Sequence, residues 1–196
     1  MHASGQVIAF DLEWNHPLEA LLQALNAHLP EDVAARQVRT APNGFDPRRH
    51  ARSRKYAYRL FFDPVRDPLR ERYAWRLWPS LALEPLQQAA SLLVGKHDFA
   101  AFGTPPRTGS STVRTVYQSE WQPEAASLVY RVTANAFLYH MVRRMVNLQV
   151  AVAQGRLALE TLAILVHSPQ QGSQILTVQG LAPAQGLFLE EVNYTE

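Results

Sequence analysis

The feature that most constrains the fold is a pair of strand-like segments followed by a long helical one. The segments at residues 111–121 and 127–134 are separated by five residues, and Leu128, Tyr130 and Val132 share one face of the second, which predicts an antiparallel hairpin. Residues 137–155 then have apolar side chains at helical spacing and end at a glycine. A hairpin that leads directly into a long helix favours an α+β fold over a strict β–α alternation.

The remaining segments fit the same class. Helical spacing predicts helices over residues 16–30, 84–95 and 159–167. Residues 55–62 alternate as a strand does, and we also predict strands over residues 5–12, 33–41 and 186–194. We therefore expect mostly antiparallel or mixed sheets flanked by helices.

A turn-rich stretch, "PNGFDP" at residues 42–47, separates two parts of the chain. Its prolines and glycine indicate a linker rather than a helix or strand. We expect a small first domain over residues 1–44 and a larger second domain over residues 45–196.

Composition excludes several classes of site. The absence of cysteine excludes disulfides, thiolate zinc sites and a cysteine nucleophile. The seven histidines have no short ligand spacing such as HxxxH, so we expect no metal site. The start has no basic-then-apolar signal pattern, and no apolar run is long enough to span a membrane, so we expect a cytoplasmic protein.

Basic residues are concentrated in one part of the chain. Twelve of the nineteen Lys and Arg residues lie between Arg36 and Arg76, together with four acids; this segment is called the basic stripe below. A basic segment with interleaved aromatics is typical of a nucleic-acid-binding surface. A solvated face of an arginine-rich protein explains the same charges equally well.

The stretch "FDPRRHARSRKYAYRL" is the strongest candidate binding site. Basic side chains that include Arg48 and Lys55 precede Tyr56 and Tyr58 where a strand begins. Cations beside a tyrosine can hold phosphates while the ring stacks on an unpaired base. Alternation puts both tyrosines on one face, so one or both also fit a role in core packing.

A second candidate is "TANAFLYHMVRRMV", in which Arg143 and Arg144 are adjacent on the predicted helix. Met141 and Met145 are four residues apart and are expected in the core. The two arginines cannot face solvent equally, so one of them can point towards a cleft. Two exposed arginines are the alternative interpretation.

Taken together, the chain resembles the TruA family of tRNA pseudouridine synthases. The matching segments occur in order along nearly the whole chain: "HASGQVIAF", "ALNAHLPEDVAARQV", "FDPRRHARSRKYAYRL", "LLVGKHDFAAF", "VRTVYQSEW", "ANAFLYHMVRRMV" and "APAQGLFLEEVNY". The resemblance implies a pseudouridine synthase fold and isomerisation of uridine to pseudouridine in the anticodon stem-loop of tRNA (tRNA positions 38 to 40), without a cofactor or metal. It also implies a homodimer in which each tRNA contacts both subunits.

The resemblance assigns roles to four residues. Tyr56 matches the tyrosine that stacks against the target base, and Arg143 matches the arginine that pairs with the catalytic aspartate. Arg48 and Lys55 match basic positions near the cleft.

The nucleophile of the family has no match in this chain. The family places an aspartate in a loop directly before the segment written here as "HASGQV", and Met1 stands where the family has valine. We therefore expect a chain that lacks part of the N-terminal domain and is inactive as given, with an internal valine codon read as a start. Two alternatives are a non-catalytic RNA-binding remnant of the fold, and substitution of the nucleophile by Asp11 or Glu13.

Overall fold

The computed structural model describes residues 1–107, 109–169 and 179–194. These residues form two compact units, one made of Met1–Gln6 with Ala51–Glu196 and one made of Val7–His50. No helix among the described residues is long and apolar enough to cross a membrane.

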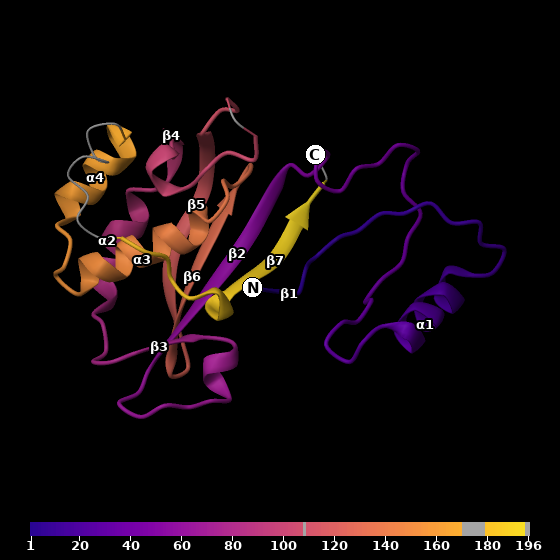
Figure 1. Cartoon of the computed structure of the whole chain (residues 1–196), viewed down its shortest axis with the longest axis horizontal. Coiled ribbons are helices and arrows are strands. Elements are labelled where there is room, and N and C mark those ends of the chain that lie inside the picture. Colours follow the sequence, from indigo (N-terminus) through magenta and orange to yellow (C-terminus); the bar gives the residue numbers. More distant parts are fainter. Residues whose placement is uncertain (108, 170–178, 195–196) are drawn as a thin grey trace. The chain divides into compact units, whose positions relative to one another are not determined.

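The larger unit is built on one mixed sheet of seven strands, traced in Figure 1. The strands are β1 (His2–Ala3), β2 (Ser53–Phe62), β3 (Trp75–Leu77), β4 (Gly95–Asp98), β5 (Val113–Glu124), β6 (Ser127–Ala134) and β7 (Leu187–Asn193). Their order is β1-β7-β2-β6-β5-β4, with β3 paired to β2. The β1–β7 and β2–β3 pairs are parallel and the others are antiparallel, so the expected α+β class with a mixed sheet is confirmed.

Three helices pack on one face of this sheet. They are α2 (Leu83–Ser91), α3 (Met141–Ala153) and α4 (Leu159–His167), and Figure 1 shows them gathered on the same side of the strands. Short 3₁₀ turns occur at η1 (Arg70–Arg72), η2 (Ala100–Phe102) and η3 (Ala184–Gly186). Buried side chains of β2, β5 and β6 form one hydrophobic core with the buried faces of the helices. The opposite face of the sheet, called the open face below, carries charged side chains that include Lys55 and Arg131.

A buried polar network ties α3 to the sheet within this core. The Trp121 indole Nε1 donates to Gln149 Oε1 at 2.7 Å, and Gln149 is fully buried. The Tyr130 and Ser119 hydroxyls lie 2.8 Å apart, and Ser119 donates to the Ala90 carbonyl oxygen. These bonds satisfy polar groups that would otherwise be costly to bury.

The smaller unit contains the helix α1 (Leu18–His28) and irregular segments on either side of it. The Asn26 side chain closes the segment after the helix: its Nδ2 donates to the Ala35 carbonyl at 2.9 Å, and the Ala35 N–H donates to Asn26 Oδ1 at 2.8 Å. The helix prediction for residues 16–30 is therefore confirmed, apart from its ends.

The two strands predicted in this region were wrong. Residues 5–12 and 33–41 lie outside the strands of the described chain, and the first pairing is the short β1 at His2–Ala3. Ile8, Phe10 and Leu12 are all more than half exposed. Alternation gives a segment two different faces, but it becomes a strand only when a neighbouring strand takes up its backbone N–H and C=O groups.

The long helix α3 begins four residues later than its sequence pattern predicts. His140, directly before the helix, has a left-handed backbone with φ of 66°. That conformation cannot continue a right-handed helix, so residues 137–140 lie outside α3, and Tyr139 is bridged to Thr104 instead. The hairpin of β5 and β6, the helix over residues 159–167 and the strand of β7 agree with the sequence predictions.

Candidate substrate-binding site

Tyr56 lies in the middle of the sheet, on the face that the helices cover. In β2 it is opposite Val132 of β6 and Leu189 of β7. Its half-buried ring packs against the core and meets the ring of Phe137 edge-on, with centroids 5.1 Å apart. Burial raises the pKa of the Tyr56 hydroxyl, and the charge of Arg54 opposes that rise. The ring is therefore held from one side and stays partly accessible.

Tyr58 shares this face but is a core residue. Its side chain is fully buried, and its hydroxyl donates to the Pro183 carbonyl oxygen at 2.7 Å. Gly186 lies against the ring so closely that an added Cβ would come within 2.7 Å of Tyr58 Cζ. Burial raises the pKa of Tyr58, and the nearby charge of Arg143 opposes the rise. Of the two tyrosines, Tyr58 is therefore the one with a role in core packing.

Arg143, in the first turn of α3, is bound to the segment that Tyr58 also contacts. Its Nε donates to the Ala182 carbonyl oxygen at 2.6 Å, and the Ala182 N–H donates to the Arg143 carbonyl at 3.2 Å. No Asp or Glu among the described residues forms an ion pair with Arg143. Its guanidinium is thus fixed in position without a carboxylate partner from residues 1–107, 109–169 or 179–194.

Arg144 is also half-buried, so the interpretation of two fully exposed arginines is wrong. Its Nε atom is buried and has no hydrogen-bond partner within the described part of the chain. Met141 and Met145 are buried in the core as the sequence predicts.

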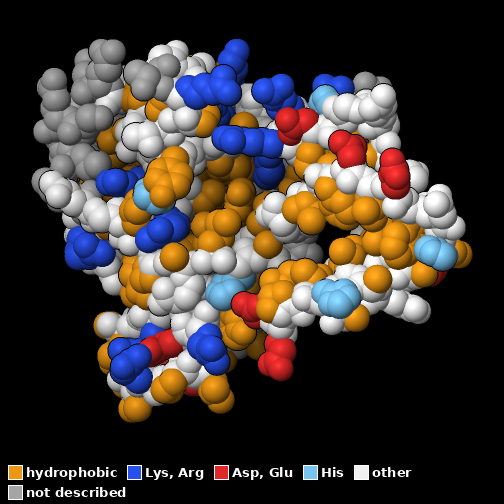
Figure 2. Space-filling model, turned by 45° about the vertical axis from the view of Figure 1, so that its right-hand side comes forward, with side chains coloured by type: hydrophobic (Ala, Val, Ile, Leu, Met, Phe, Trp, Pro, Cys, Tyr) orange, Lys and Arg blue, Asp and Glu red, His pale blue; other side chains and the backbone are white. Residues whose placement is uncertain are grey.

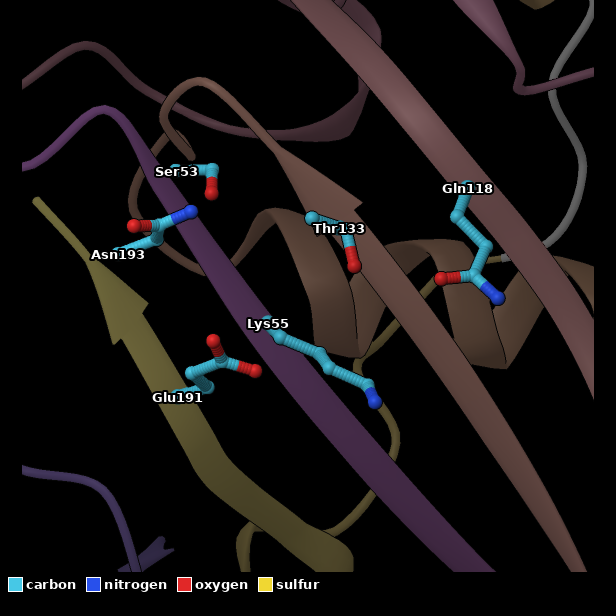
Figure 3. A pocket seen from close by; sticks show the side chains of 6 residues that line it. All are labelled: Ser53, Lys55, Gln118, Thr133, Glu191 and Asn193. Atoms are coloured by element: carbon cyan, nitrogen blue, oxygen red, sulfur yellow. The ribbon is translucent and has the colours of Figure 1, made fainter. Parts of the chain in front are cut away.

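Lys55 lies on the opposite face of the sheet from Tyr56. Its Nζ is 3.7 Å from a Glu190 carboxylate oxygen, which is also 3.5 Å from Arg131 Nε. Figure 3 shows Lys55 among the side chains that line a polar pocket of the open face. The other residues that line this pocket are Ser53, Gln118, Thr133, Glu191 and Asn193. Successive residues of a strand point to opposite faces, so Lys55 and Tyr56 cannot contact the same side of a ligand.

Arg48 belongs to the smaller unit and lies in a turn organised by Asp46. The Asp46 Oδ1 atom accepts the backbone N–H groups of Arg48 and Arg49 at 2.8 and 3.0 Å. These two backbone bonds lower the pKa of the Asp46 carboxyl. Asp11 and Glu13, the two substitute nucleophiles that the sequence offers, belong to this unit as well.

Several arginines of the basic stripe contact other side chains of the protein. Glu71 forms ion pairs with both Arg66 and Arg76. The hydrogen bond to Arg66, and to a smaller extent that to Arg76, lowers the pKa of the Glu71 carboxyl. The guanidinium groups of Arg59 and Arg70 instead lie over the rings of Phe188 and Phe61. Figure 2 shows a face of the molecule on which blue Lys and Arg side chains border hydrophobic ones, a mixture suited to phosphates and bases together.

The sequence pattern does not reveal Phe137 and Ala182, which hold Tyr56 and Arg143 in place. Helical spacing assigns Phe137 to a helix, and its partner Tyr56 lies in a distant part of the chain. Ala182 contacts Arg143 through its backbone carbonyl. Every residue has a backbone carbonyl, so the sequence does not single out Ala182.

Comparisons with known proteins identify the family. Residues 89–195 match the model of a tRNA pseudouridine synthase family. The chain is 36% identical to tRNA pseudouridine synthase A of Neisseria gonorrhoeae (strain NCCP11945) over 194 residues, which cover 99% of this chain and 72% of the relative. It is 32% identical to the enzyme of the same name from Bacillus subtilis (strain 168), over 99% of this chain and 77% of the relative.

The matches extend over both compact units, and they agree with the resemblance that the ordered sequence segments indicate. The chain belongs to the tRNA pseudouridine synthase A (TruA) family, a family of isomerases that act on tRNA.

Proposed function

We propose that this chain binds the anticodon stem-loop of tRNA, with Tyr56 stacking on the target uracil and Arg143 pairing with the nucleophilic carboxylate. The observation that carries the proposal is the placement of both residues on the helix-covered side of one sheet. Tyr56 adjoins the turn before α3, and Arg143 lies in the first turn of that helix.

The environment of Tyr56 suits a stacking role. A target base inside an RNA stem has to leave its stack before its glycosidic bond can be attacked. A half-buried ring that is held edge-on by Phe137 offers such a base a flat surface with little loss of side-chain freedom.

The environment of Arg143 suits the binding of a carboxylate. Its Nε is taken by Ala182, which leaves the terminal nitrogens of the guanidinium as donors. A cation at ion-pair distance keeps an acid ionised by lowering its pKa. An aspartate held this way is a ready nucleophile at neutral pH.

The reaction needs no external group in this scheme. The glycosidic bond of uridine breaks, the uracil rotates, and a C–C bond forms to the same sugar, so the product has the atoms of the substrate. The scheme requires a stacking surface, a basic surface for phosphates and one carboxylate.

We propose further that the 196-residue chain does not catalyse the reaction by itself. The resemblance places the nucleophile in a loop with no counterpart among these residues. The rival assignment, a non-catalytic RNA-binding remnant, predicts the same inactivity. A protein that is extended at its N-terminus with the family loop separates the two, since only an enzyme gains pseudouridine formation from the extension.

The proposed assembly is a homodimer in the cytoplasm, with each tRNA in contact with both subunits. Sedimentation of the protein with and without tRNA tests this: a complex whose mass corresponds to a single chain with a single tRNA would contradict it.

Binding of tRNA is tested by its salt dependence. Neutralising Arg48, Arg52 and Lys55 together should flatten the dependence of log K on log salt by about one unit for each phosphate that is no longer bound. The matched control neutralises three basic residues outside the basic stripe, namely Lys96, Arg107 and Arg156, and should leave the slope close to that of the unmodified chain. Equal slopes for the two triple variants would show that the basic stripe is only a solvated face.

A further inference from the structure

An exposed pair of aromatic rings lies directly before α3. The rings of Tyr139 and His140 are tilted by 35° and their centroids are 3.7 Å apart. The Tyr139 side chain is 66% exposed, and His140 is exposed as well. An exposed tyrosine on its own is common, but this pair is also held by its backbone and lies in the segment that joins Phe137, which contacts Tyr56, to Arg143.

The backbone holds the pair in place. The Tyr139 N–H donates to the Thr104 carbonyl at 2.9 Å, and the Thr104 N–H donates back to the Tyr139 carbonyl at 3.4 Å. Gly103 permits this close approach, because a Cβ at that position would come within 2.4 Å of the Tyr139 oxygen. His140 keeps its left-handed backbone between this bridge and the first turn of α3. The two rings are therefore presented to solvent from a fixed turn.

The pair belongs to the same segment as the proposed site. Phe137, two residues before Tyr139, contacts the ring of Tyr56. Arg143 and Arg144 follow in the first turn of α3. An exposed aromatic pair, in a segment that also contacts Tyr56 and carries two arginines, has the composition of a surface that binds a single-stranded nucleotide.

We infer that Tyr139 and His140 form a second stacking position, which takes an unpaired nucleobase that neighbours the target uridine. The inference rests on the proposed tRNA-binding function and adds a base contact to it. Base–aromatic stacking tolerates any base, because every base has a π-face. The contact therefore favours unpaired RNA over duplex without reading its sequence.

The test measures binding of the 196-residue chain to two RNAs of equal phosphate number, a hairpin with an unpaired loop and a fully paired duplex. Fluorescence anisotropy gives the dissociation constants. Tyr139→Ala should weaken hairpin binding about tenfold and leave duplex binding unchanged. The salt slope should also be unchanged, since no charge is removed.

Three further variants sharpen the test. Tyr139→Phe keeps the ring and should bind the hairpin as the unmodified chain does. His140→Asn keeps a residue that tolerates the left-handed backbone but removes the second ring, and it should weaken hairpin binding. Tyr117→Ala removes a tyrosine of similar exposure, 56%, from β5 and should have no effect. Thermal unfolding of each variant confirms that the fold is kept.

Equal hairpin affinity for the Ala and Phe variants at position 139 would overturn the inference while leaving tRNA binding intact. So would equal losses of affinity on hairpin and duplex, or a Tyr139→Ala variant that changes only the oligomeric state, which would assign the pair to a protein interface. Failure of the unmodified chain to bind the hairpin at all would instead overturn the proposed function on which the inference rests.

Discussion

Arg143 and Ala182 are joined by two hydrogen bonds that run in opposite directions between α3 and the segment before β7. The side-chain Nε of Arg143 donates to the Ala182 carbonyl, and the Ala182 N–H donates to the carbonyl of Arg143. The next residue, Pro183, accepts the hydroxyl of Tyr58. The proposed partner of the nucleophile is thus fixed by the same segment that anchors the core tyrosine of β2.

Replacing Arg143 with alanine should lower the free energy of unfolding by about 1–3 kcal/mol, because the buried Ala182 carbonyl loses its side-chain donor. Urea unfolding measures the change. Arg156→Ala is the control: that side chain binds Gln154 at the surface, and its removal should cost no more than about 0.5 kcal/mol. Equal effects of the two substitutions would mean that the Ala182 bond adds nothing.

Gln149→Ala should be more costly, at about 2–4 kcal/mol, because it leaves a cavity and a buried Trp121 indole N–H without an acceptor. In the Trp121→Phe background no indole N–H remains, so the same substitution should cost less. A double-mutant cycle from urea unfolding gives the coupling, and strictly additive effects would contradict the role of this bond.

Alkaline pH should destabilise the fold through Tyr130. Burial raises the pKa of its hydroxyl to about 12, and the bonds to Ser119 and Gln149 oppose that rise. The folded pKa therefore lies above the unfolded value of about 10. The contribution of Tyr130 to the free energy of unfolding is complete below a pH of about 10 and is lost as the pH rises towards about 12.

Tyr130→Phe removes this group and should make the fall in unfolding free energy between a pH of about 10 and about 12 shallower than in the unmodified chain. Thermal unfolding across this pH range measures the difference. Parallel curves for the two proteins would show that Tyr130 does not contribute.

We expect Tyr56 to contribute to RNA binding and Tyr58 to contribute to the stability of the fold. Tyr56→Ala should weaken binding of an RNA hairpin about tenfold because the stacking surface is removed, and Tyr56→Phe should preserve it. Tyr58→Phe should leave binding by the folded protein unchanged and lower the unfolding free energy by about 1 kcal/mol, because the Pro183 carbonyl loses its donor. Anisotropy and urea unfolding measure the two effects, and weaker binding by Tyr58→Phe would contradict the division.

Local periodicity in the sequence determined most of the secondary structure of the larger unit. The alternation of Leu128, Tyr130 and Val132 gives one buried face of β6, and the apolar spacing of residues 159–167 gives α4. Such patterns are reliable because one face of each segment is packed against the core, and a shift by one residue would expose it. The order of the sequence motifs along the chain is also enough to identify the family.

Tertiary structure alone decided the elements and contacts that depend on distant partners. Residues 7–12 alternate like a strand but belong to no strand of the described chain, whereas His2–Ala3 is a strand because β7 runs beside it. The contact of Phe137 with Tyr56 and the bonds between Arg143 and Ala182 join positions far apart in sequence. The sequence records which side chains can meet, but pairing and close packing are settled only when the whole chain brings two backbones within hydrogen-bonding distance.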